Sequence, residues 1–180
     1  MSRNVQVVLL CEDRQQQAFA SRFLKRAGRG YRLQRVEFCP KGCGEQFVRE
    51  RFAKELGYYR SRQYRVGQAL IVFIDADTKG ATERIEQVED GAVKSGQSPR
   101  QINERVAIFV PARNIETWIA YLDGQTVTEK DKYPHLKHER DCRQHAESLY
   151  EMCQQGALRQ PAPPSLETAC VEYRSRLQQI

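Results

Sequence analysis

Several features that would assign the chain to a specialised class are missing from its 180 residues. No apolar run approaches the length that a helix needs to cross a bilayer, so we expect no membrane partner. The first residues lack the order of charged, apolar and small residues that marks a signal peptide, and a cytoplasmic location is therefore expected. No glycine-rich Walker loop is present, so any ATPase acting with this chain would be a separate protein.

Cysteines are few and widely scattered, unlike the dense disulfide framework of small secreted domains. We therefore expect reduced thiols, most of them buried or half-buried. Cys39 and Cys43 flank a glycine-containing turn, and His138 with Cys142 is the best-spaced second half of a zinc site. Neither half is a strong signature, so structural Zn²⁺ is not expected.

The composition suits one compact domain with a modest extension. Hydrophobic residues make up 40% of the chain, which is enough for a core. The formal net charge is +6, and a basic surface favours a polyanion such as nucleic acid. A charge of this size is equally compatible with a role in solubility alone.

Apolar runs alternate with helical patterns through the first 122 residues. This alternation predicts an α/β fold with a four-stranded, mainly parallel sheet and helices on both faces. We expect this domain to span residues 1–124, with 125–180 as a helical extension packed on it. The expected strands are 5–11, 31–38, 69–74 and 106–110, and the expected helices are about 15–25, 45–64, 81–94, 115–122, 138–155 and 165–177.

Acidic residues follow three of the four predicted strands. Glu12 ends the first, Asp75 and Asp77 end the third, and Glu116 lies just beyond the fourth. Because the carboxyl ends of parallel strands meet at one edge of a sheet, these carboxylates are expected to cluster. Their repulsion would be relieved by a hard divalent cation, and we predict one or two Mg²⁺ or Mn²⁺ ions. The alternatives are a polar turn at Asp75 and Asp77 and an ordinary helix N-terminal acid at Glu116.

With these residues the chain resembles the TOPRIM domain of topoisomerases, primases and overcoming-lysogenization-defect (OLD) nucleases. The resemblance covers roughly residues 5–122 and rests on LLCE with Glu12, VFIDAD with Asp75 and Asp77, and FVPARNIETWIA with Glu116. That last segment is similar to the third acidic block of small TOPRIM-like proteins from bacterial defence loci. The chain departs from the family pattern where Asp13 stands in place of glycine and Gln16 in place of a further acid.

The resemblance implies metal-dependent hydrolysis of phosphodiester bonds in DNA or RNA. Glu12, Asp75 and Asp77 would then be metal ligands, and Glu116 would be a ligand or the base that orients water. Lys79 would offset charge on the phosphate, unless it is simply a solvated loop lysine. The resemblance further implies an effector in an anti-phage defence system that acts with a separate ATPase.

Basic residues interleaved with tyrosines suggest a surface for nucleic acid, with cations on phosphates and rings on bases. One basic string begins at Arg22 and Lys25, and a second runs through residues 49–65. The alternative for the second string is a solvated helix with interspersed acids. The residues predicted to bind nucleic acid are Arg14, Arg49, Lys54, Arg60, Arg62, Arg65 and Arg113.

Two other functions remain open from the sequence. A metal-dependent small-molecule phosphohydrolase or phosphotransferase would use Asp75 as nucleophile and Asp77 as general acid. A non-catalytic module would instead bind nucleic acid or a partner protein through the basic surface. A homodimer also remains possible.

Overall fold

The computed structural model describes residues 4–28, 30–40, 42–62 and 67–178. Within these ranges no helix has both the length and the apolar character that a bilayer crossing requires. The elements in chain order are β1 (Val5–Leu10), α1 (Arg14–Ala27), β2 (Tyr31–Glu37), α2 (Gly44–Arg62), β3 (Gln68–Phe73), α3 (Ala81–Lys94), β4 (Val106–Phe109), α4 (Ile115–Leu122), the short 3₁₀ helix η1 (Glu139–Cys142), α5 (Arg143–Gln155) and α6 (Pro164–Arg176).

The four strands form one sheet in the order β2-β1-β3-β4, and every neighbouring pair is parallel. This confirms the predicted α/β fold. The chain passes from β1 to β2 on one side and then places β3 on the other side of β1. The strand order therefore reverses between β1 and β3, and open α/β sheets bind their ligands at the carboxyl end of such a reversal.

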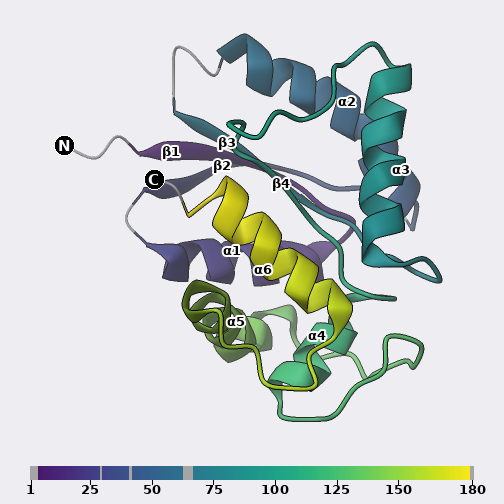
Figure 1. The fold of residues 1–180 in the computed structure, drawn as a ribbon, viewed down its shortest axis with the longest axis vertical. Helices are drawn as coiled ribbons and strands as arrows, with labels where there is room; N and C mark the ends of the chain where they lie inside the picture. The colour runs from purple at the N-terminus through teal and green to yellow at the C-terminus, as the bar shows by residue number, and fades with distance from the viewer. Residues whose placement is uncertain (1–3, 29, 41, 63–66, 179–180) are drawn as a thin grey trace.

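Helices cover both faces of the sheet, with α2 and α3 on one side and α1, α5 and α6 on the other (Figure 1). Alternate side chains of β3 explain this arrangement, because successive residues of a strand point to opposite faces. Ile71 and Phe73 pack in the cluster that contains α1, α4, α5 and α6. Leu70 and Val72 pack in the cluster that contains α2 and α3. A strand buried on both faces is apolar throughout, as the run ALIVFI predicts.

The C-terminal helices are tied to the sheet by polar contacts as well as by apolar packing. Trp118 Nε1 in α4 donates to Ser165 Oγ in α6 at 2.9 Å. Glu172 in α6 accepts the backbone N–H of Ile108 in β4 at 2.8 Å, and it also pairs with the buried Arg100. Residues on both sides of position 124 share one hydrophobic cluster, and the division at 124 stays a prediction.

Four of the six cysteines are joined in disulfides, contrary to the expectation of reduced thiols. Cys39 bonds to Cys43 across the turn before α2, where their Cα atoms lie 6.1 Å apart. Cys153 in α5 bonds to Cys170 in α6, with Cα atoms 4.7 Å apart. Both separations are in the range that a disulfide spans, and spacing along the sequence did not reveal the α5–α6 pair because helix packing creates it.

Candidate functional site

A cavity of about 650 Å³ opens at the carboxyl ends of β1 and β3. Its wall contains three of the four predicted acids, Glu12, Asp75 and Glu116. The turn that carries Cys39 borders it, and its other polar lining residues are Asp13, Arg14, Gln15, Asn114, His135, Lys137 and Glu139. The cavity therefore lies where the strand order reverses, and it is lined by carboxylates from three separate strand ends.

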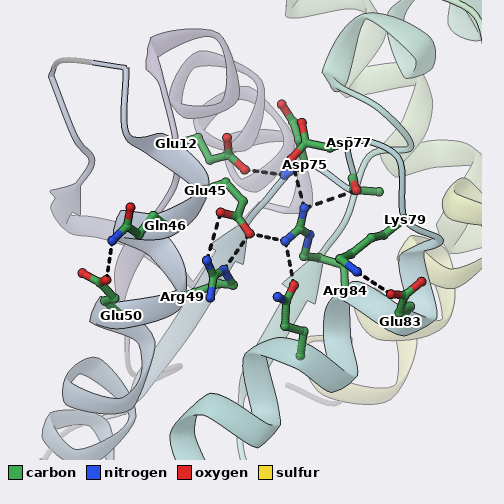
Figure 2. Close-up of polar contacts among 12 residues, drawn as sticks. Glu12, Glu45, Gln46, Arg49, Glu50, Asp75, Asp77, Lys79, Glu83 and Arg84 are labelled. Carbon is green, nitrogen blue, oxygen red and sulfur yellow. Dashed lines mark hydrogen bonds and ion pairs between the residues drawn. The ribbon is translucent and has the colours of Figure 1, made fainter.

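Glu12 and Asp75 are held together by hydrogen bonds that leave little freedom. Glu12 Oε1 accepts the backbone N–H of Asp75 at 2.6 Å (Figure 2). Gln16 Nε2 donates to Asp75 Oδ1 at 2.8 Å, and Gln16 Oε1 accepts the backbone N–H of Glu12 at 2.9 Å. Gly44 at the start of α2 lies so close that an added Cβ would stand 2.7 Å from Glu12 Cβ. A side chain at position 44 would therefore displace Glu12.

Both of these carboxyl groups resist ionisation in the folded protein. Burial raises the pKa of Glu12 to about 7, and the charges of Asp77 and Asp13 add to the increase. Burial likewise raises the pKa of Asp75 well above its ordinary value, with contributions from Glu12, Asp13 and Glu116. The pKa values are raised because several carboxylates share a desolvated space, and such carboxylates attract a cation or retain a proton.

Glu116 enters the cavity from the first turn of α4 and is only 4% exposed. His135 Nδ1 lies 2.6 Å from Glu116 Oε1, while 82% of the His135 side chain is exposed. The histidine comes from the loop between α4 and η1, which folds back over the strand ends. This contact favours one orientation of the Glu116 carboxylate.

Asn114 supplies an oxygen that has no partner among the described residues. Asparagine at a helix N-cap ordinarily accepts a backbone N–H with its side-chain oxygen. Asn114 is the N-cap of α4 but makes no such bond, and its Oδ1 is buried without a hydrogen bond. Buried polar atoms are rarely unpaired, so an orphaned oxygen on the wall of an acidic cavity indicates a place for a cation or an ordered water.

Asp77 is turned away from this cavity. Its backbone is left-handed, with φ of 53°, and its N–H donates to the carbonyl of Arg113, whose φ is 57°. Asp77 Oδ2 accepts from Arg84 Nη2 at 3.0 Å, and Arg84 is a buried arginine that also contacts Glu45 (Figure 2). Asp77 is not among the described residues that line the cavity. Strained backbone of this kind is common beside functional sites.

Lys79 does not face the acidic cavity either. Its Nζ pairs with Glu83 Oε1 at 2.5 Å on the surface of α3, one helical turn further on (Figure 2). Exposed pairs of this type contribute little to stability and exchange readily with solvent. Lys79 is therefore close to the site in sequence, but its charge is directed to another carboxylate.

The carboxylate and amide oxygens of this cavity are of the chemical type that hard divalent cations prefer. Among the described residues, no three histidine, cysteine, aspartate or glutamate side chains converge into a ready-made metal cage. Mg²⁺ in enzymes is commonly held by one or two carboxylates together with waters and substrate oxygens. Asp75, Glu116 and Glu12 provide such carboxylates, and the unpaired Asn114 Oδ1 provides a neutral oxygen.

Two of the predicted nucleic-acid residues lie near the strand ends. Arg14 is exposed at the start of α1 and lines the acidic cavity. Arg113 follows β4, and its Nη1 donates to the carbonyl of Lys130 at 2.8 Å, so that its guanidinium anchors a loop.

The basic string on α2 is largely neutralised. Arg49 donates to Glu45 one helical turn earlier, at 2.6 Å. Arg60 donates to Glu104 at 2.7 Å and also reaches two backbone carbonyls of the following loop. The structure thus favours the alternative of a charged helix with matching acids for these arginines. Of the other predicted cations, Lys54 lies over the Tyr58 ring, Arg62 is exposed at the end of α2, and Arg65 lies outside the described residues.

Replacing Glu12 by glutamine is expected to change how stability depends on pH in the metal-free protein. Because the folded-state pKa of Glu12 is about 7 and its ordinary value is 4.5, the folded protein binds the proton more tightly between these values. The wild type should therefore lose stability as pH rises from about 4.5 to about 7, by on the order of 2 kcal/mol. Thermal unfolding in EDTA across this range measures the loss.

The stability of the variant Glu12→Gln should depend less on pH, so its stability relative to the wild type should increase as the pH rises. Glu86→Gln is the matched control, because Glu86 is exposed on α3. Parallel profiles for the wild type and Glu12→Gln would contradict the assignment of a raised pKa to this carboxyl.

No family model matches the chain, and no curated protein or solved structure shows a significant match to it. The resemblance to the TOPRIM domain therefore rests on the residues at the strand ends.

Proposed function

We propose that the protein is a divalent-metal-dependent nuclease that hydrolyses phosphodiester bonds of DNA or RNA. One observation carries the proposal: carboxylates from three strand ends share a single cavity at the reversal of strand order, beside an unpaired amide oxygen. The raised pKa values of Glu12 and Asp75 support the proposal, because carboxylates that repel one another in a desolvated space attract a cation. The resemblance of these strand-end residues to the TOPRIM pattern supports the same proposal.

In this proposal Asp75 is the central ligand, with Glu12, Glu116 and Asn114 as the other candidate ligands. A bound Mg²⁺ or Mn²⁺ would polarise the phosphate and lower the pKa of a coordinated water. Gln16 holds the Asp75 carboxylate in place, and His135 holds that of Glu116. The two hydrogen bonds restrict how far these carboxylates move when the charge in the cavity changes.

The position of Asp77 argues against the phospho-aspartate alternative. A general acid would have to share the cavity with the nucleophile at Asp75, whereas the Asp77 carboxylate is bound to Arg84. The same contact makes Asp77 a residue that orders the loop after β3. A direct role of Lys79 on the phosphate would likewise require it to leave Glu83.

Four further statements belong to the proposal and rest on the sequence. The resemblance to TOPRIM-like proteins supports a role in anti-phage defence together with a separate ATPase, and a homodimer remains compatible with it. A cytoplasmic location is proposed from the sequence pattern and does not depend on this resemblance. The two disulfides weigh against that location, because reducing compartments rarely keep such bonds.

The proposal is tested by incubating the purified protein with single- and double-stranded DNA and RNA, with Mg²⁺, with Mn²⁺, or with EDTA. We expect cleavage that requires the metal. Glu116→Gln should lower the cleavage rate by more than about tenfold, since even outer partners of metal ligands commonly contribute ten- to hundredfold.

Glu86→Gln removes the same charge from an exposed position and should retain the wild-type rate. Cleavage that persists in EDTA, or that proceeds at the same rate in Glu116→Gln and Glu86→Gln, would overturn the proposed site. Turnover of small phosphate esters with no cleavage of any nucleic acid would instead favour the phosphohydrolase alternative.

A further inference from the structure

A second cavity, of about 630 Å³, lies along α1 next to the acidic cavity. One face of α1 forms its floor, because residues three, four and seven positions apart line the same side of a helix. The short helix η1 and the end of β2 close its other sides. Its lining consists of Arg14, Gln17, Ala18, Ser21, Arg22, Lys25, Phe38, Glu139 and Arg140, and we refer to it as the α1 groove.

The cations of the α1 groove form no salt bridge with the described acids, although the charge of Glu147 acts on Arg22 from a longer distance. Among the described residues, Arg14, Arg22, Lys25 and Arg140 have no carboxylate within salt-bridge distance, in contrast to Arg49 and Arg60 on α2. The groove contains one carboxylate, Glu139, whose backbone carbonyl accepts from Gln15. A concave surface with this excess of positive charge attracts polyanions more strongly than a flat one.

The α1 groove adjoins the acidic cavity. Arg14, Phe38 and Glu139 line both of them, so a chain lying in the groove would have its end close to the wall that carries Glu12 and Asp75. Phe38 stands at the junction, and it is partly buried against the core. A basic groove beside a carboxylate-lined cavity suits a phosphodiester strand, because the cations attract its phosphates.

We propose that the α1 groove is the path along which a single-stranded nucleic acid reaches the acidic cavity. The cations would bind successive phosphates, and a base would stack on Phe38 at the entrance. The groove is the size of a small-ligand pocket, and an aromatic ring can stack only on an unpaired base. This inference rests on the proposed function in one respect, because it takes the acidic cavity as the place to which the bound strand leads.

The test measures binding of short single-stranded DNA, single-stranded RNA and duplex DNA in EDTA, so that no cleavage occurs. Lys25→Gln should weaken single-strand binding several-fold. It should also lower the slope of log affinity against log salt by about 0.7, the value for one phosphate contact. The double variant Arg22→Gln/Lys25→Gln should lower the slope by about 1.4.

Lys94→Gln is a closely matched control. Lys94 is an exposed lysine in the last turn of α3, as Lys25 is in the last turn of α1, and both helices have 14 residues. It should leave the affinity and the salt slope unchanged. Equal losses from Lys25→Gln and Lys94→Gln would overturn the proposal, because they would reflect net charge alone.

Phe38→Leu tests the stacking contact, since leucine keeps the apolar packing but has no flat ring. We expect roughly tenfold weaker binding of single strands and unchanged binding of duplex DNA. Duplex binding as tight as that of single strands, with both weakened by the variant, would overturn the single-strand assignment. These binding measurements need no catalysis. If the protein binds single strands through the α1 groove but never cleaves them, the proposed nuclease activity is refuted and the proposed binding site is retained.

Discussion

Replacing Asp75 by asparagine is expected to abolish metal-dependent cleavage and to make the metal-free protein more stable. The introduced amide would keep an oxygen for the hydrogen bond from Gln16 but would lose the charge that a cation requires. Loss of a direct ligand should lower the cleavage rate by more than about 100-fold, beyond the effect of an outer partner. Stability should rise because a buried carboxyl whose pKa is raised by burial and by Glu12 and Asp13 no longer has to ionise.

Two measurements check this result. In EDTA at about pH 8, the melting temperature of Asp75→Asn should exceed that of the wild type by several degrees, at about 2–4 °C per kcal/mol. Added Mn²⁺ should stabilise the wild type, by about 2.7 kcal/mol at 100 times its dissociation constant, and should not stabilise Asp75→Asn. Asp90→Asn, an exposed change on α3, is the control for charge. An equal response of Asp75→Asn and the wild type to Mn²⁺ would place the metal elsewhere.

Replacing Arg100 by methionine is expected to lower the free energy of unfolding more than any other substitution proposed for this protein. Arg100 is only 3% exposed on its side chain, and it donates to Glu89, to Glu172 and to the carbonyl of Val106. Without the guanidinium, two partly buried carboxylates lose their partner. Breaking a buried pair from one side commonly costs 3–5 kcal/mol, and the partial exposure of Glu89 reduces this to about 2–4 kcal/mol.

Chemical denaturation measures this loss as a fall in the free energy of unfolding. The double variant Arg100→Met/Glu172→Gln should recover a large part of it, because glutamine still accepts the N–H of Ile108 without bringing an unpaired charge. Arg143→Met removes an exposed ion pair with Glu147 and should change stability by less than about 0.5 kcal/mol. Equal losses of stability in Arg100→Met and Arg143→Met would contradict the role of Arg100 in joining α3, α6 and β4.

The fold was predictable because its signals are local. Apolar runs such as VQVVLL and ALIVFI can be buried only between two layers of helices, and this fixed the parallel sheet. The edge position of β2 leaves Arg32, Leu33 and Gln34 all exposed, so the alternation in its sequence is not matched by alternating burial. The disulfide between Cys153 and Cys170 was not predictable, because it depends on how α5 packs on α6.

The three carboxylates of the candidate site could be predicted from the sequence, whereas the positions of the residues around them could not. Topology alone brings Glu12, Asp75 and Glu116 to one edge of the sheet. The direction of Asp77 depends on a left-handed backbone, which no residue pattern marked in advance. His135 reaches Glu116 through a loop without periodicity.

The basic residues illustrate the same limit. The spacing of Glu45 and Arg49 was a visible sign of pairing along a helix. The pairing of Arg60 with Glu104, 44 positions away, was not.

The contact between Glu172 and Ile108 also determines how the sheet meets other proteins. A free edge strand offers unpaired backbone groups that another chain can extend, which promotes aggregation. Helix α6 covers β4, and Glu172 occupies one of its outward N–H groups, so this side cannot accept a further strand there. Among the described strands, β2 is therefore the more open edge, and its exposed Arg32 discourages a second copy from joining through its own β2.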